Sequence, residues 1–182
     1  MPHSNIIAGK SEDEVWETIA EQLNRKEDNL DYTAQFSTEK HCIILDIDIH
    51  PDLGEEGEKP ITSFSAQLPD ETTFRFNIEK QGLKHQIGKL FGMQDVIIGQ
   101  TEFDKKFLIQ SNDEAKVKEV FSAAEISDEL LKNPVIGFKI RERKIGTTKE
   151  IVLSLDIEGG ITEPDKLKEI FRPFRIVLNS LD

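Results

Sequence analysis

The sequence predicts an α+β fold in which a largely antiparallel sheet of about six to eight strands is packed by an N-terminal and a C-terminal helix. Three observations support this prediction. Apolar residues recur every three to four positions near both ends of the chain, as in helices that cover a core. Between these ends, apolar and polar residues alternate in several short segments, as in half-buried strands. Turn-forming residues separate neighbouring segments, which favours hairpins.

The N-terminal helix is predicted over Glu12–Arg25. Residues 1–10 show no periodic pattern, so we expect a flexible N-terminus there. Ser11 and Glu14 have the spacing of a capping box, in which the Ser hydroxyl accepts a hydrogen bond from the Glu amide. The apolar stripe of this helix consists of Val15, Trp16, Ile19, Ala20 and Leu23.

A hairpin is predicted next, with strands near Tyr32–Phe36 and Ile43–His50 joined by a turn at Ser37–Lys40. Two more alternating segments, at 62–68 and 74–78, predict further strands. In the second strand of the hairpin we expect Ile43, Leu45, Ile47 and Ile49 to face the core, and Ile44, Asp46, Asp48 and His50 to face the other way.

The middle of the chain has a weaker pattern. Val96–Ile98 is predicted to be a short buried strand and Phe107–Ile109 a second strand. A helix is expected to begin at a capping box on Ser111, and a shorter one to be capped by Ser127 and to end before Asn133-Pro134.

The last third predicts a second hairpin and a final helix. Its strands include Ile136–Ile140 and Ile151–Ile157, joined by a turn at Gly146–Thr148. The final helix starts with Pro164 in its first turn, and Pro173 is expected to kink it. Its apolar stripe consists of Leu167, Ile170, Phe171, Phe174, Leu178 and Leu181.

The length of 182 residues favours a single domain over residues 11–182. Residues 43–49 and 151–157 have the same alternation of apolar residues, and each segment closes a hairpin that follows a helix. This echo suggests a helix–hairpin unit used twice, with two similar lobes at about 11–91 and 92–182. The alternative is that any two half-buried strands share such alternation.

Composition excludes several classes of protein. The chain has 23 basic and 35 acidic residues and a net charge of −12, so we expect neither nucleic-acid binding nor attraction to anionic membranes. No apolar run approaches the roughly 18–20 residues of a membrane-spanning helix, and the first residues lack a signal-peptide pattern. The single Cys42 excludes an internal disulfide and is expected to be buried. A cytoplasmic location follows as the expectation.

The clearest candidate for chemistry is the set of Asp46, Asp48 and His50. Alternation in a strand places all three on one face, where two carboxylates and an imidazole would suit a divalent metal that activates water. The alternative is an ordinary solvated strand face. The sequence contains no nucleophile elbow, dinucleotide-binding turn, phosphate-binding loop or zinc-protease motif, so no catalytic residue and no cofactor are assigned.

One basic cluster is present, formed by Lys139, Arg141, Arg143 and Lys144. It has two interpretations: an anion site, or cross-strand ion pairing with Arg143 opposite Glu150. We favour the pairing, because the cluster is short and has no aromatic residues interleaved on its face.

The stretch that begins at Asp95 contains Phe103, Asp104 and Phe107 in the order D-x-x-(I/V)-G-x-x-x-F-D-x-x-F-x-(I/V). It resembles a signature of bacterial domains of unknown function, over residues 82–158. The Asp-Pro of that signature is replaced here by Gln-Thr. The resemblance implies a Leu-rich helix followed by a β-hairpin, and it implies no activity.

The residues of this motif also have a physical interpretation. Phe103 and Phe107 flank a turn into a strand and are expected to anchor it in the core, while Asp104 is expected to accept hydrogen bonds from nearby amides. The alternative is a ligand-binding role.

These observations predict a soluble, bacterial, non-enzymatic binding or interaction module whose partner is a protein or a small molecule. The alternative is a metal-dependent hydrolase that uses Asp46, Asp48 and His50. A third hypothesis is self-association through an uncovered sheet edge.

Overall fold

A computed structural model describes residues 5–9, 11–25, 31–38, 40–49, 59–82 and 92–181. The strands are β1 (Asn5–Ile7), β2 (Tyr32–Ser37), β3 (Cys42–Asp48), β4 (Ile61–Leu68), β5 (Phe76–Lys80), β6 (Gln94–Asp95), β7 (Phe107–Ser111), β8 (Val135–Ile145) and β9 (Thr148–Glu158). The helices are α1 (Glu12–Arg25), α2 (Thr101–Lys106), α3 (Glu114–Val120), α4 (Ala124–Lys132) and α5 (Pro164–Asn179).

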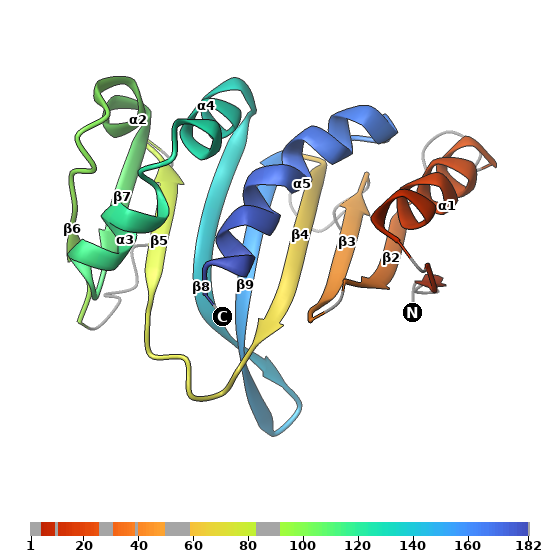
Figure 1. Cartoon of the computed structure of the whole chain (residues 1–182), viewed down its shortest axis with the longest axis horizontal. Coiled ribbons are helices and arrows are strands. Elements are labelled where there is room, and N and C mark those ends of the chain that lie inside the picture. The colour runs from red at the N-terminus through yellow and green to blue at the C-terminus, as the bar shows by residue number, and fades with distance from the viewer. Residues whose placement is uncertain are drawn as a thin grey trace.

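The fold is α+β and has two layers (Figure 1). The strands form one sheet in the order β1-β2-β3-β4-β9-β8-β5-β7-β6, and the described helices lie together on one of its faces. Every pairing is antiparallel except that of β1 with β2. The described sheet has nine strands, more than the six to eight expected, because it includes two edge strands of three and two residues. Such short strands leave no alternation to recognise.

The predicted terminal helices both pack on the sheet. Helix α1 buries Val15, Trp16 and Ile19 and has the predicted bounds, while Ser11 Oγ accepts a hydrogen bond from Glu14 N at 3.3 Å. Helix α5 packs beside α1 and over β4, and Pro173 lies inside it. The terminal helices therefore form the middle and one end of the helical layer (Figure 1).

Aromatic rings form a continuous chain between the two layers. Trp16 contacts Phe171 with ring centroids 5.5 Å apart, and Phe171 contacts Phe64 of β4 at 5.3 Å. On the same helix, Phe174 stacks on Phe138 of β8 at 6.3 Å. The chain continues through Phe76, Phe121, Phe103 and Phe107. One hydrophobic core thus extends under the helices from α1 to α2.

The two faces of the sheet differ as the alternation predicted. In β3, Ile43, Leu45 and Ile47 are fully buried under the helices, whereas Asp46 is exposed on the opposite face. Tyr32 begins β2 on the covered side and donates a hydrogen bond to Gln22 Oε1 at 2.9 Å. Burial raises the pKa of Tyr32 to about 12.

The halves of the chain share this one sheet. Strands β9 and β8 lie between β4 and β5, so strands from residues 11–91 and from 92–182 alternate in space. The two hairpins β2–β3 and β8–β9 each follow a helix, as the helix–hairpin echo predicted. No element was expected in residues 1–10, but β1 pairs with β2 there.

Several local predictions are corrected. Val96–Ile98 is not a strand: β6 ends at Asp95, and Ile97 is 70% exposed. Residues 101–106 form helix α2 instead of a turn. Cys42 is exposed instead of buried, because it lies at the start of β3 on the face that no described helix covers.

The caps of the two middle helices also differ from the prediction. Asp113 caps α3 by accepting from Lys116 N at 3.0 Å, while the Ser111 hydroxyl donates to Arg75 O at 2.9 Å. Ser127 lies inside α4, whose N-cap is Ala123. In both cases the spacing predicts a cap from a hydroxyl near the helix start, but that hydroxyl donates its hydrogen bond to a backbone carbonyl.

Strand β8 differs from the prediction at one position. Ile136 is only half-buried, because the register shifts between Val135 and Gly137. Phe138 and Ile140 are buried on the covered face as expected. The weak pattern at 83–91 and the loop at 51–58 lie outside the described residues.

Candidate functional site: a pocket between the terminal helices and the first hairpin

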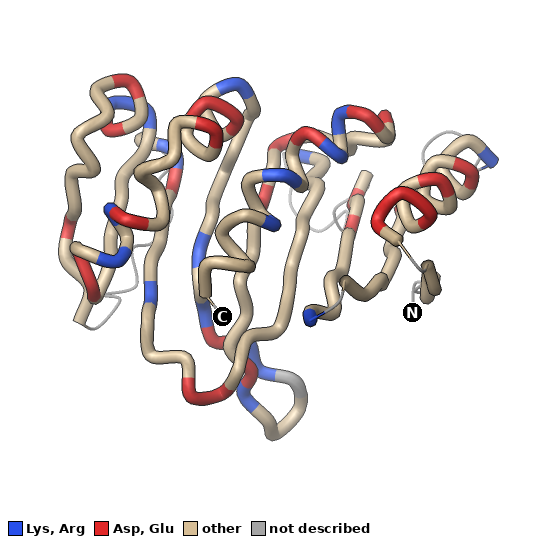
Figure 2. The backbone as a smooth tube through the Cα atoms, in the orientation of Figure 1, with Lys and Arg blue, Asp and Glu red and all other residues tan. Residues whose placement is uncertain are grey.

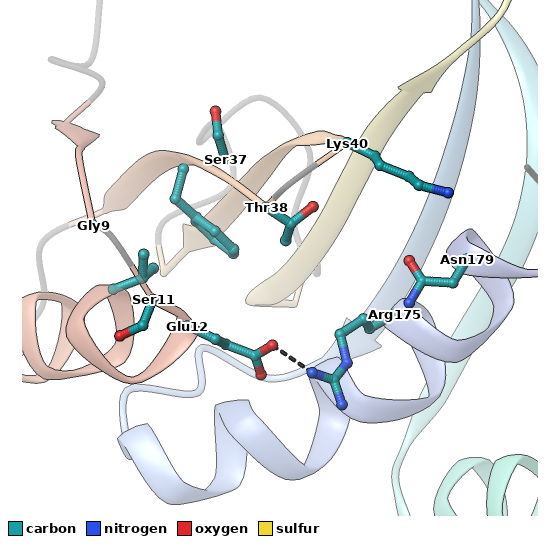
Figure 3. Close-up of a pocket in the computed structure, with 10 residues that line it drawn as sticks. Gly9, Ser11, Glu12, Ser37, Thr38, Lys40, Arg175 and Asn179 are labelled. Carbon is teal, nitrogen blue, oxygen red and sulfur yellow. Dashed lines mark hydrogen bonds and ion pairs between the residues drawn. The ribbon is translucent and has the colours of Figure 1, made fainter.

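A pocket of about 670 Å³ lies where three distant parts of the chain meet (Figure 3). Its walls are the segment leading into α1, the turn between β2 and β3, and the last turns of α5. The volume falls within the roughly 300–1,000 Å³ typical of small-molecule sites. The lining residues are Gly9, Ser11, Glu12, Val15, Phe36, Ser37, Thr38, Lys40, Arg175 and Asn179.

The apolar part of the pocket is formed by Val15 and Phe36. Phe36 is the last inward-facing residue of β2 and is 2% exposed. Val15 lies on the buried stripe of α1 and is 3% exposed. Val15 and Phe36 therefore form an apolar floor where the core reaches the pocket, and each exposes only a small part of its side chain there.

An ion pair stands at the wall between the two helices. The carboxylate of Glu12 accepts a hydrogen bond from the guanidinium of Arg175, and the two side chains point toward each other in Figure 3. Lys40 contributes a second cation from the β2–β3 turn. Among the described residues, the lining thus contains two cations and one carboxylate, although the whole chain has a net charge of −12. The local charge of the described lining is therefore more favourable to an anionic group than the net charge of the chain suggests.

Hydroxyl and amide groups complete the lining. Ser11, at the start of α1, and Ser37 and Thr38, at the end of β2, supply hydroxyls, and Asn179 supplies an amide. Thr38 is held in the turn because its amide donates to His41 O at 2.9 Å. None of the described lining residues is a His or a Cys, so this part of the lining offers polar groups that can orient a ligand but no imidazole or thiol.

The metal candidates lie elsewhere. Asp46 and Asp48 are on the uncovered face of β3, where Asp46 Oδ1 accepts a hydrogen bond from Thr33 Oγ1 at 2.5 Å. His50 lies outside the described residues. Within the described ranges, no group of three His, Cys, Asp or Glu side chains is arranged to hold a metal ion. The metal-dependent hydrolase stays a prediction, and metal analysis of the wild-type protein and of Asp48→Ala would test it.

Phe103, Asp104 and Phe107 lie together at the far end of the sheet from the pocket. Phe103 and Phe107 are buried with ring centroids 4.8 Å apart. The two carboxylate oxygens of Asp104 accept hydrogen bonds from Ile98 N and Gly99 N, each at 2.9 Å. These contacts attach helix α2 to the segment that follows β6, which is a structural role.

The basic cluster on β8 is engaged in cross-strand pairs. Arg143 Nη2 lies 3.2 Å from Glu150 Oε2, as the interpretation of cross-strand pairing requires. Lys139 Nζ is 3.9 Å from Asp156 Oδ2 on β9. Arg143 and Lys139 therefore have carboxylate partners within the chain, so these two cations do not require a bound anion.

Comparisons with known proteins add no relative: no family model matches the chain, and no significant match was found among curated proteins or solved structures. Among the described residues, none of the helices has the length and apolar character needed to cross a membrane.

Where the sequence singles out polar residues of the pocket, it gives them only structural roles: Ser11 caps a helix, and Ser37–Lys40 form the turn of a hairpin. The pocket combines residues from 9–15, 36–40 and 175–179, and no local pattern relates these segments. A basic residue on the polar side of the final helix was the one available signal, but it specifies no partner by itself.

Proposed function

We propose that this chain is a non-enzymatic binding module whose ligand is a small organic anion with an apolar body, held in the pocket between α1, α5 and the β2–β3 turn. The observation that carries the proposal is the combination of a buried apolar surface with Arg175 and Lys40 at the same cavity. An apolar body would cover Val15 and Phe36, and the anionic group would lie near the guanidinium.

Glu12 has a defined part in this proposal. Its carboxylate occupies Arg175 in the absence of a ligand, so an incoming anion competes with it. Both side chains are about two-fifths exposed, at 39% and 41%, which makes the ion pair weak enough to exchange. Glu12 therefore acts as a built-in competitor that sets the affinity for the anion.

The test uses two fluorescent probes that share one aromatic framework. 8-Anilino-1-naphthalenesulfonate has an anionic group, whereas N-phenyl-1-naphthylamine is neutral. We expect saturable binding of the sulfonate at one site and weaker binding of the neutral probe. Arg175→Met should weaken sulfonate binding about tenfold, since it removes one charge-assisted hydrogen bond, and leave the neutral probe unaffected.

Two further variants sharpen this test. Glu12→Gln should tighten sulfonate binding several-fold because it frees Arg175. Arg172→Met is the matched control, because Arg172 is exposed on the same helix and does not line the pocket. Equal affinity for the sulfonate in wild type, Arg175→Met and Arg172→Met would refute the proposed site.

The remaining features of the proposal follow from the sequence. The single Cys42 supports a cytoplasmic location and the acidic composition supports solubility, whereas the bacterial type rests on the resemblance alone. The same acidity supports a protein or small-molecule partner over nucleic acid. The resemblance of residues 82–158 to bacterial domains stays a prediction and does not carry this function.

A further inference from the structure

The pocket between α1, α5 and the β2–β3 turn has charges of opposite sign on different walls. Glu12, in the first turn of α1, supplies a carboxylate, while Arg175 on α5 and Lys40 in the turn supply cations. Two more acidic residues, Asp13 and Glu14, lie in the same first turn. Figure 2 shows the acidic positions at the start of α1 and basic positions along α5. The pocket is therefore polarised from an acidic wall to a basic wall.

The ion pair at the centre of this polarised lining has hydrogen-bonding capacity left. Arg175 Nη1 donates to Glu12 Oε2, and among the described residues neither charged group makes another hydrogen bond. A guanidinium has several N–H donors and a carboxylate has several acceptor sites, so both groups can bind more than one partner. Both side chains line the cavity and are about two-fifths exposed, at 39% and 41%. A ligand in the pocket can therefore reach both members of the pair.

A ligand with only a negative charge leaves one charge of this pair poorly compensated. If the anionic group displaces Glu12 from Arg175, the Glu12 carboxylate loses its partner. If the anionic group lies beside the pair instead, it is repelled by Glu12. A cationic group next to the anionic group removes this cost, because it pairs with Glu12 while the anionic group pairs with Arg175.

An α-amino acid has the required arrangement of charges, since its ammonium and carboxylate groups are bonded to the same carbon atom. Beside the Glu12–Arg175 pair, these two groups complete a ring of four charges that alternate in sign. Such a ligand has no net charge at neutral pH, so the net charge of −12 on the chain does not repel it as it repels an anion.

The remaining lining can hold the body of an amino acid. Ser37, Thr38 and Asn179 offer hydroxyl and amide groups for hydrogen bonds with the polar head. Val15 and Phe36 form the floor, where the exposed parts of their side chains are apolar. An apolar side chain on the ligand is therefore favoured over a charged one.

We propose that the ligand of this pocket is a free α-amino acid with an apolar side chain, an assignment that rests on the proposed function of the same pocket. The carboxylate of the ligand binds Arg175, and its ammonium binds Glu12. Glu12 then competes with ligands that are only anionic, but it is a binding residue for a ligand that also carries an ammonium group.

Three ligands that share a phenylethyl group test this proposal. Phenylalanine has both charged groups, 3-phenylpropanoate has only the carboxylate, and phenethylamine has only the ammonium. Each is titrated at pH 7 to about 10 mM into isotope-labelled protein, with amide chemical shifts as the measurement, so that dissociation constants near about 1 mM can be determined. We expect phenylalanine to bind at least about tenfold more tightly than either analogue, because each analogue lacks one charge-assisted contact.

The variant Glu12→Gln separates this proposal from a site for anions alone. It should weaken phenylalanine binding about tenfold, since the ammonium loses its partner, yet tighten the binding of 3-phenylpropanoate several-fold. Glu17→Gln is the matched control, because it makes the same change of charge at an exposed position of α1 that does not line the pocket. Arg175→Met should weaken the binding of both phenylalanine and 3-phenylpropanoate.

Three results would overturn the assignment. If the sulfonate probe binds as expected but phenylalanine binds no more tightly than 3-phenylpropanoate, the ligand is an anion without an ammonium group, and the proposed function stands without this inference. If phenylalanine binds equally well to wild type, Glu12→Gln and Arg175→Met, the amino acid occupies another surface. If the wild type binds neither the sulfonate nor any of the three ligands, the proposed function fails as well.

Discussion

Removal of the Asp104 carboxylate is expected to destabilise the fold without any change in ligand binding. The carboxylate accepts two hydrogen bonds of 2.9 Å, from Ile98 N and Gly99 N, and so joins helix α2 to the preceding segment. Charge-assisted hydrogen bonds contribute roughly 1.5–3 kcal/mol each. Because Gly99 is exposed and Ile98 half-buried, water replaces part of what is lost. We therefore expect Asp104→Ala to lower the free energy of unfolding by about 2 kcal/mol.

The assay is urea unfolding followed by the fluorescence of the only tryptophan, Trp16, together with a thermal melt. For a chain of this length, about 2 kcal/mol corresponds to a fall in Tm of about 4–8 °C. Asp104→Asn keeps one carbonyl acceptor and should cost about half as much. Glu102→Ala on the same helix removes only an exposed ion pair with Lys105 and should cost less than about 0.5 kcal/mol.

The reasoning is refuted if Asp104→Ala unfolds within about 0.5 kcal/mol of the wild type. If that variant were fully stable but had lost the sulfonate probe, Asp104 would belong to a binding site, which is the alternative interpretation of its motif. The distance of Asp104 from the pocket, at the other end of the helical layer, argues for the structural role (Figure 1).

Three further predictions follow from the core and from one capped helix. Tyr32, the only tyrosine, should ionise near pH 12 in the folded protein and near pH 10 in urea, as followed by absorbance at 295 nm. Because the pKa is raised in the folded state, the contribution of the neutral Tyr32 side chain to the free energy of unfolding is complete below pH 10. This contribution is lost as the pH rises toward 12. Phe171→Ala should cost about 3–5 kcal/mol in urea unfolding, since this buried ring contacts four other aromatic rings, whereas Arg172→Ala on the exposed side should stay within about 0.5 kcal/mol. Lys106→Met should lower the free energy of unfolding by about 1–2 kcal/mol, because Lys106 Nζ donates to three carbonyls at the end of α4, at 2.6–3.3 Å. Lys105→Met is the matched control, and a similar loss in that variant would contradict a stabilising contact between Lys106 and α4.

The fold could be predicted where the pattern extends over enough residues. The fourteen residues of α1 and the long hairpin strands repeat their apolar positions several times, and they lie where the sequence placed them. Strands β1 and β6 were missed because two or three residues contain at most one repeat, and their pairing depends on neighbours distant in sequence. The sequence predicts a turn in place of helix α2, because six residues hold fewer than two helical turns and show no helical period.

The pocket could not be predicted from the sequence, because its residues are far apart in the chain. Glu12 and Arg175 form an ion pair across 163 positions, and Phe36 joins them from a hairpin between the two. Glu12 lies in the first turn of a helix, Arg175 lies on a helix surface and Phe36 lies at the end of a strand, and each position is ordinary in its local sequence. These residues form a pocket only because α1 packs beside α5. By contrast, the polar face of β3 was predicted, because strand alternation alone determines it.

The measurement that tests the pocket most directly is a titration of the isotope-labelled protein with 8-anilino-1-naphthalenesulfonate, followed by amide chemical shifts. We expect the largest saturable changes on amides of the three segments around Ser11, Thr38 and Asn179, and we expect Arg175→Met to reduce them at equal probe concentration. Changes concentrated on the sheet face opposite the helices, or spread over the surface without saturation, would contradict the assignment of this pocket as the binding site.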